Sequence, residues 1–352
     1  MKTKWMALAF CSLSLTQFSC NHDDTDKARQ WNGDVLIVNE GPFQTGTGTV
    51  DAYLSSSGQL QSDVYGTVNG RPLGNIVQSL TVFQDRIYIV INNAGRVEVA
   101  DYFTFGSIGV IEPLTLPRYF IASPEGKGYV SCWDKTIRVI NLSSLELTGS
   151  IPTGSGPDEM AIAGGRLFVI NSGGFGTDST VTVIDMISNE VIATLEVGHR
   201  PVGISQDQDG VLWVLCSGKG WNGFPAAGDS QGKLVKIDPQ TLEMAVEAEF
   251  GNPGIHPDNL AMAEGGMKFF FNMPDGIHFY DAVQQSFSNG PFVPRHSMFY
   301  GLGLDKLNGT MYAADPVDYV QNGWVFRFRA SDGEAIDSFR VGVVPGSFWF
   351  EH

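Results

Sequence analysis

Four arginines adjoin a proline that recurs along the chain, and they are the residues best suited to bind a charged ligand. They are Arg71, Arg118, Arg200 and Arg295. A guanidinium group binds phosphate, carboxylate or amide oxygens through paired hydrogen bonds of fixed geometry. Asp158 and Asp258 stand beside the same proline in other copies of the repeat. A second interpretation is therefore equally open, in which arginine–aspartate pairs tie neighbouring repeats together.

Large aromatic side chains in Gly-rich segments form a second set of candidates. An exposed ring is unfavourable unless it contacts something, and a flat ring gives much contact area for little loss of rotamer freedom. The alternative for each ring is that it folds down onto its own loop. The ligand-contacting candidates are Phe43, Tyr119, Trp133, Phe175, Trp221, Phe224 and Tyr319, with Asn222 as an amide partner.

Sequence motifs for catalysis are absent. There is no nucleophile elbow, phosphate-binding loop, CxxC or HExxH pattern, and paired carboxylates are scattered along the chain. His199, His256 and His296 belong to three different repeats, which disfavours a shared zinc site. We therefore expect no catalytic residue, no metal and no cofactor. With 22 Lys+Arg against 38 Asp+Glu, a net charge of −16, the chain also lacks the basic character of a nucleic-acid partner.

The recurring proline precedes an apolar segment seven times, at a spacing of roughly 45 residues, which is the length of one four-stranded propeller blade. A second, a third and a fourth segment follow in most repeats, and the third segment alternates apolar and polar residues, as in 136–141 and 180–185. The pattern predicts an all-β fold, a seven-bladed β-propeller with four antiparallel strands per blade. The prolines are Pro72, Pro117, Pro157, Pro201, Pro257, Pro294 and Pro345.

The two ends of the repeat region predict how the ring closes. The chain enters at Asp34 with a second-strand sequence, and the missing first strand appears only at the C-terminus. We expect Phe348–Phe350 to pair beside Leu36–Val38, which would hide the exposed sheet edges. Cys132 and Cys216 fall in mid-strand in separate repeats, so we expect two buried thiols and no disulfide between them.

Strand order predicts one working face. Loops from the second strand to the third, and from the fourth strand to the next blade, emerge on the same face of a propeller. The long loops 40–48, 171–179, 217–232 and 315–323 belong to that face, together with the Arg-Pro positions. The aromatic and arginine candidates should therefore gather around one mouth.

The N-terminus has the pattern of an exported lipoprotein. Lys2 and Lys4 precede a short apolar run that ends at Ser19-Cys20. We expect a signal peptide at 1–19, acylation of Cys20, an acidic tether at 20–33 and the propeller at 34–352. Gln17 replaces the leucine usual in such signals, which leaves a plain secretory cleavage open. The acidic run after Cys20 resembles the export tag that places lipoproteins on the outer face of an outer membrane.

The repeat wording resembles the YVTN family of β-propellers across residues 34–352. The best matches are VGHRPVGIS and TVTVIDMISNEVIATLEVG. An acylated cysteine, an acidic tether and a YVTN-like propeller together resemble the surface lipoproteins of the BtuG type, which bind vitamin B12 (cobalamin). This resemblance implies capture of cobalamin or a related corrinoid and its transfer to a TonB-dependent outer-membrane transporter, with membrane contact through the lipid anchor only. Two alternatives stay open: a glycan-binding or glycan-cleaving surface propeller, and a protein-interaction scaffold on a transporter.

Overall fold

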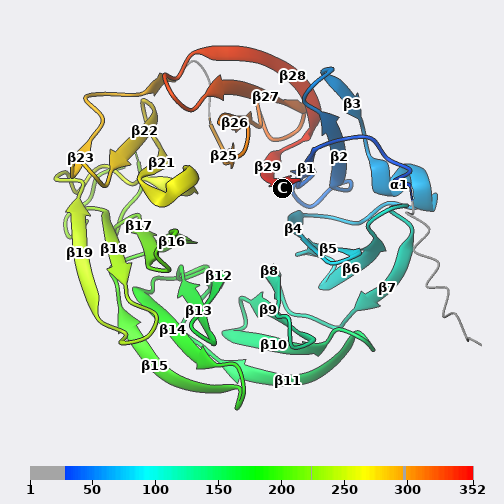
Figure 1. The fold of residues 1–352 in the computed structure, drawn as a ribbon, viewed down its shortest axis with the longest axis horizontal. Helices are drawn as coiled ribbons and strands as arrows, with labels where there is room; N and C mark the ends of the chain where they lie inside the picture. The colour runs from blue at the N-terminus through cyan, green and yellow to red at the C-terminus, as the bar shows by residue number, and fades with distance from the viewer. Residues whose placement is uncertain (1–27, 223, 296–298, 352) are drawn as a thin grey trace, which may run out of the picture.

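The structure is a computed structural model that describes residues 28–222, 224–295 and 299–351, without the side chain of Glu264. Seven antiparallel sheets stand around a central axis (Figure 1). Helix is confined to α1 (Val64–Asn69) and the single turn η1 (Glu264–Gly266) within this part of the chain. The prediction of an all-β, seven-bladed propeller is confirmed.

Each blade is a sheet whose innermost strand lies nearest the central axis, and the strands follow one another outward. Blade one is β29 (Pro345–Phe350), β1 (Val35–Asn39), β2 (Thr49–Leu54) and β3 (Gln59–Gln61). Blade two is β4 (Val77–Phe83), β5 (Arg86–Ile91), β6 (Arg96–Asp101) and β7 (Ser107–Ile111). Blade three is β8 (Pro117–Ala122), β9 (Lys127–Cys132), β10 (Thr136–Asn141) and β11 (Glu146–Pro152).

The other four blades repeat this order. Blade four is β12 (Pro157–Ala163), β13 (Arg166–Asn171), β14 (Thr180–Asp185) and β15 (Glu190–Glu196). Blade five is β16 (Pro201–Gln206), β17 (Leu212–Cys216), β18 (Lys233–Ile237) and β19 (Met244–Glu249). Blade six is β20 (Asp258–Met262), β21 (Lys268–Met273), β22 (Gly276–Asp281) and β23 (Ser286–Phe287), and β24 (Val293–Pro294) also pairs with β22. Blade seven is β25 (Gly301–Asp305), β26 (Thr310–Asp315), β27 (Asn322–Arg329) and β28 (Ala335–Val343).

The core lies between the blades, because a second strand is apolar on both of its faces. In β5, Ile87 and Ile89 join the apolar cluster shared with blade one, whereas Tyr88 and Val90 join the cluster shared with blade three. Successive side chains of a strand point to opposite faces, so one strand supplies both clusters. The Tyr88 ring stacks on Phe120 of blade three with 4.0 Å between centroids.

The ring closes as the sequence predicts. β29 pairs antiparallel with β1, which places Phe348 opposite Ile37 and Trp349 opposite Leu36. β29 also contacts β25 and β4, the innermost strands on either side of it. One blade is therefore built from both ends of the repeat region.

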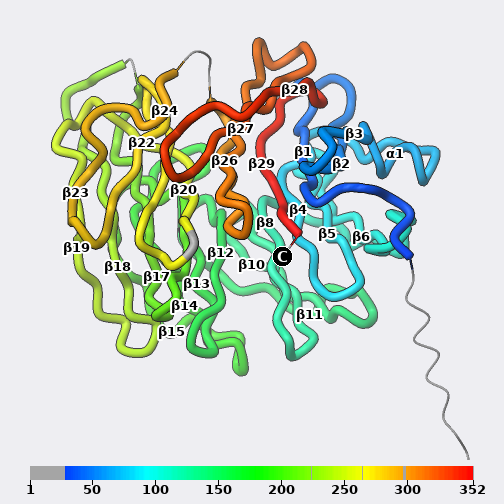
Figure 2. Tube along the Cα trace, turned by 45° about the horizontal axis from the view of Figure 1, so that its top comes forward, coloured from blue at the N-terminus to red at the C-terminus, as the bar shows by residue number. Residues whose placement is uncertain are grey.

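The described N-terminal segment is fastened to the face opposite the long loops. Arg29 donates hydrogen bonds to the Tyr102 hydroxyl at 3.0 Å and to Glu351 Oε1 at 2.6 Å. Trp31 Nε1 donates to the Tyr102 carbonyl at 2.6 Å. Tyr102 follows β6, so this contact lies where third strands end. Figure 2 shows the described N-terminal segment in dark blue. The predicted signal peptide, Cys20 and most of the tether lie outside the described residues.

Two of the seven prolines are out of phase with the blades. β4 begins at Val77, well after Pro72, and Pro294 belongs to the short edge strand β24. The other prolines begin an innermost strand or directly precede it. Proline has no N–H to give to a sheet, so both strand starts and edge strands tolerate it, and the residue alone does not distinguish them.

The cysteine prediction is confirmed for the described residues. Cys132 and Cys216 are free and buried. Burial raises the pKa of each thiol to about 12, so both act as small apolar side chains. No helix in the described part of the chain is long and apolar enough to cross a membrane.

Candidate ligand-binding face

A cavity of about 290 Å³ opens where the seven innermost strands begin. Each blade contributes at least one residue to its lining within one residue of the start of its innermost strand. The ring comprises Gln78, Arg118, Asp158, Val202, Asp258, Tyr300 and Gly346. Positions far apart in the sequence are thereby brought into one polar chamber.

Four carboxyl groups line this chamber: Glu40, Asp158, Glu159 and Asp258. Carboxylates that are scattered along the sequence therefore lie together in the folded protein, because the ring brings matching positions of distant repeats into one cavity. Burial raises the pKa of Glu159 to about 8, and that of Glu40 to about 7. The Tyr300 hydroxyl donates to Glu40 Oε1 at 3.1 Å. Acids with such raised pKa values in a cavity are typical of a functional site.

These raised pKa values predict a pH-dependent stability. Between about pH 4.5 and pH 8 the folded protein keeps a proton on Glu159 that the unfolded chain has released. The free energy of unfolding should therefore fall as pH rises through this window. Melting temperatures at constant ionic strength should be higher at pH 5.5 than at pH 8.5, and Glu159→Gln should reduce that difference. An unchanged difference in Glu159→Gln, equal to that in the exposed control Glu146→Gln, would contradict this assignment.

Arg118 forms the kind of arginine–aspartate pair between neighbouring blades that the second interpretation of the sequence predicts. Its Nε donates to Asp158 Oδ1 at 3.0 Å, and its Nη1 donates to the Gln78 side chain. The guanidinium also lies over the Trp133 ring, 4.3 Å from the centroid. Ser172 Oγ donates to the second carboxylate oxygen of Asp158 at 2.7 Å. The network joins blades two, three and four, so Arg118 connects neighbouring blades at the floor of the chamber.

Arg118→Ala and Asp158→Ala should therefore produce the same defect. Each leaves a partly buried charge without its partner, so each should lower the free energy of unfolding by about 1–3 kcal/mol. The double variant should be little worse than either single one, because both remove the same interaction. Urea unfolding of the three variants measures this coupling. Fully additive losses would show that the ion pair is not what holds these blades together.

The other three arginines of the predicted ring lie at different places in the structure, and only one of them lines the mouth. Arg71 pairs with Glu98 at 2.7 Å and lies beside α1, so the expectation that it joins the mouth is wrong. Arg295 donates to the Pro274 carbonyl at 2.9 Å and lines none of the three cavities of this face. Both adjoin out-of-phase prolines, which explains the displacement. Arg200 does reach the mouth, where its guanidinium lies 4.3 Å from the centre of the Trp221 ring.

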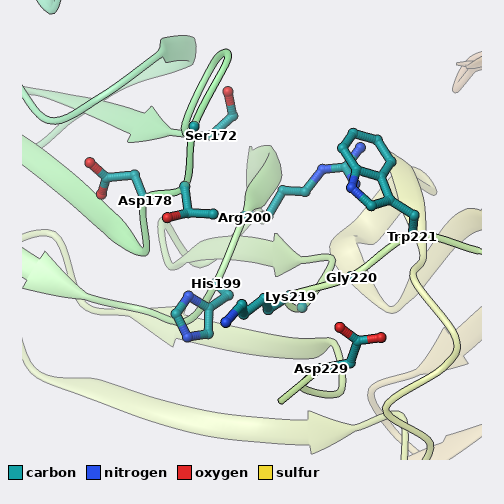
Figure 3. Close-up of a pocket in the computed structure, with 11 residues that line it drawn as sticks. Ser172, Asp178, His199, Arg200, Lys219, Gly220, Trp221 and Asp229 are labelled. Atoms are coloured by element: carbon teal, nitrogen blue, oxygen red, sulfur yellow. The ribbon is translucent and has the colours of Figure 1, made fainter. Parts of the chain in front are cut away.

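Arg200 and Trp221 line two further cavities besides the central one. One of about 270 Å³ lies beside loops 171–179 and 217–232, and another of about 410 Å³ is lined by Phe224 and His256. Figure 3 shows the Arg200 side chain reaching toward the Trp221 indole. Trp221 is 66 % exposed. The stacked pair therefore lines all three cavities.

The remaining aromatic candidates surround this hollow at different depths. Tyr119 and Trp133 line the central cavity, and Phe175, 87 % exposed, packs edge-on against Trp133 at 5.0 Å. Tyr319 packs edge-on against Tyr300 at 5.7 Å. Phe43 is exposed on the same face but lines none of the three cavities. Some of the aromatic rings therefore line the central cavity, and others pack against neighbouring rings or stay exposed on the same face.

Asn222, the predicted amide partner, lines the cavity of about 410 Å³, and its side chain is hydrogen-bonded to the backbone of His256. Its side chain donates to the His256 carbonyl and accepts from the His256 N–H, both at 2.8 Å. These two bonds fasten the tip of loop 217–232 to blade six and hold Trp221 over the mouth. His199 and His256 line separate cavities, and His296 lies outside the described residues. Across the described residues no group of three metal-ligating side chains forms.

Sequence reasoning missed several residues of this face. They are Glu40, Gln78, Glu159, Lys219 and Tyr300. The signal for Glu159 was present, since it directly follows Asp158 at the repeated proline. Gln78 and Tyr300 occupy the matching place in the two blades whose prolines are out of phase, which hid them.

A closed ring of seven four-stranded sheets with a hollowed mouth defines a seven-bladed β-propeller. Residues 33–267 match the family described as "Domain of unknown function (DUF5074)", and the chain belongs to this family. The matched region includes Arg118, Arg200 and Trp221 but not Tyr300. A comparison with curated protein sequences finds no match.

Solved structures with a similar fold are distant in sequence. A quinonprotein alcohol dehydrogenase-like protein from Bacteroides thetaiotaomicron is 17% identical, with a TM-score of 0.68 over 91% of this chain and 78% of that one. The periplasmic gluconolactonase of Pseudomonas aeruginosa is 13% identical, with a TM-score of 0.66 over 90% of this chain and 99% of that one. At these identities the likeness shows the propeller fold alone.

Proposed function

We propose that this protein is a cell-surface lipoprotein that captures cobalamin or a related corrinoid and passes it to a TonB-dependent outer-membrane transporter. The observation that carries the proposal is the three adjoining cavities that meet at Arg200 and Trp221. A corrinoid is a wide, flat disc, and it needs a broad hollow with aromatic surface. The exposed rings of Trp221, Phe224 and Phe175 offer that surface around the hollow.

The polar lining suits the fringe of such a disc. Amide side chains of a corrin carry NH₂ donors, and the chamber presents carboxyl groups and the Gln78 amide as acceptors. Most of these residues belong to strands, and some of their side chains are held by neighbours, as in the Arg118–Asp158 pair. The lining is therefore formed before a ligand binds. A pre-formed site loses less entropy on binding than one that must be ordered.

The attachment of the N-terminus is compatible with surface capture. The contact of Arg29 with Tyr102 and Glu351 lies on the face opposite the long loops. A lipid on Cys20 would then be joined to that opposite face. The aromatic mouth would remain open to a ligand that arrives from outside the cell.

Gel filtration of the purified propeller with cobalamin tests the proposal. The ligand absorbs visible light, so a complex should elute as a coloured protein peak. The expected result is co-elution of cobalamin with the wild-type protein. A colourless protein peak at micromolar protein and ligand would reject corrinoid capture.

A second candidate, a glycan-binding or glycan-cleaving propeller, is favoured by one observation. Carboxyl groups of Asp158 and Glu159 line the same cavity as the Trp133 and Trp221 rings. Sugars stack on aromatic rings, and glycoside hydrolysis uses a pair of carboxyl groups. A pure interaction scaffold is less favoured, because this face is hollowed and not flat.

A further inference from the structure

The cavity of about 270 Å³ beside Trp221 gathers three basic side chains in a protein of strongly negative charge. His199, Arg200 and Lys219 all line it (Figure 3). Within the described residues, the Lys219 ammonium and the Arg200 guanidinium make no ion pair within 4 Å and no side-chain hydrogen bond. Arg200 stacks on Trp221, and its charge acts on the Asp258 carboxyl only from beyond ion-pair distance. Arg71 and Arg118, in contrast, are both committed to carboxylates.

The backbone beneath these side chains is fixed by hydrogen bonds. Arg200 N–H donates to the Asp178 carbonyl at 2.9 Å, and the Arg200 carbonyl accepts from Ser217 at 2.8 Å. Arg200 has a φ of 53°, the left-handed region that a non-glycine residue adopts only where its surroundings hold it. Lys219 exchanges two bonds of 2.9 Å with Ser230. Both cations therefore start from rigid positions at the cavity wall.

Two carboxylates share the cavity, and both are already engaged. Asp178 accepts from the Ser155, Ser179 and Thr180 N–H groups and from the Thr180 hydroxyl. Asp229 accepts from the Ala226 N–H at 2.7 Å. Hydrogen bonds of this kind stabilise an isolated carboxylate without a cation. Arg200 and Lys219 are thus left available for an external anion.

We infer that this cavity is an oxyanion subsite that takes a phosphate group. Arg200 and Lys219 supply the positive charge, His199 supplies a ring nitrogen, and Trp221 separates the subsite from the central chamber. The natural source of that phosphate rests on the proposed function: it is the phosphodiester in the nucleotide tail of a corrinoid. The disc would then lie over the mouth while its tail enters beside loop 217–232.

Lys219→Gln tests the subsite by titration calorimetry with two corrinoids. Cobalamin carries the phosphate, whereas cobinamide lacks the nucleotide tail. Loss of one charge-assisted hydrogen bond should weaken cobalamin binding about tenfold to a hundredfold and leave cobinamide binding unchanged. The control is Lys135→Gln, an exposed lysine of the same face outside the cavities, which should bind both ligands like the wild type. Equal losses for both ligands, or no loss for cobalamin, would overturn the subsite.

If the wild type binds neither corrinoid, the proposed function fails and inorganic phosphate decides the subsite by itself. At constant ionic strength, phosphate should then raise the melting temperature of the wild type and of Lys135→Gln more than that of Lys219→Gln. An equal rise in all three proteins, or no rise in any, would overturn the subsite as well.

Discussion

A protein that ends at Val343 should be insoluble, because it lacks the innermost strand of the first blade. The deletion removes all of β29 and exposes the edge of β1, whose residues from Val35 to Asn39 pair with it. An exposed, apolar edge strand is a template for aggregation. The deletion also removes Phe348 and Phe350, whose rings lie 5.8 Å and 5.2 Å from that of Tyr312 in blade seven.

The expected loss is large against the stability of a whole domain. Each aromatic side chain contributes roughly 1.5–3 kcal/mol when fully buried, and a domain has only about 5–15 kcal/mol in total. Ending the chain at Phe350 is the matched control, since it removes the contacts of Glu351 with Arg29, Tyr102 and Asp34 but leaves β29 whole. The soluble fraction after expression is measured for both. A soluble 1–343 protein that melts like the parent would contradict closure of the ring by β29.

Trp221→Ala should weaken corrinoid binding by about ten- to a hundredfold. A stacked aromatic ring contributes ~1–3 kcal/mol by analogy with base–aromatic stacking, and about 1.4 kcal/mol is tenfold in affinity. Trp221 borders all three cavities, so its loss should affect every orientation of a bound disc. Stability should barely change, because the ring is mostly exposed and its one described ring contact is with the Arg200 guanidinium.

Titration calorimetry with cobalamin, paired with a melting curve, separates contact from packing at Trp221. The control is Ile187→Ala, an exposed apolar side chain in the turn after β14 on the opposite face, which should leave both quantities unchanged. Unchanged affinity with a lowered melting temperature in Trp221→Ala would mean that the ring serves packing. In that case the stacked pair with Arg200 would be structural, as the Arg118 pair is.

The 45-residue repeat in the sequence predicted the ring of blades. The incomplete repeats at the two ends of residues 34–352 predicted how the ring closes. Apolar segments of the second strands had to be buried on both faces, and only a ring of blades offers two neighbours to each sheet. The pairing of Phe348 with Ile37 followed from the missing first strand at Asp34. The long loops after β1, β13, β17 and β26 could be assigned to one face from strand order alone.

The chemistry of the mouth was less predictable, because it depends on distances between blades. The sequence put Arg118 and Arg200 in the same class, yet only Arg118 meets a carboxylate within 4 Å. Arg118 follows its proline and points at Asp158 of the next blade, whereas Arg200 precedes its proline and points at Trp221. A one-residue offset at the start of a strand changes the direction in which a side chain points. The pattern of a single sequence does not show which partner that side chain then contacts.

The most direct test of corrinoid capture at this face is a crystal of the propeller grown with cobalamin, measured at the cobalt absorption edge. Cobalt scatters anomalously there, so the ligand's metal is located without interpretation of the surrounding density. We expect one peak over the cavity bordered by Arg200, Trp221 and Phe224. A peak on another surface, or no peak from crystals grown with cobalamin at a saturating concentration, would contradict corrinoid capture at this face.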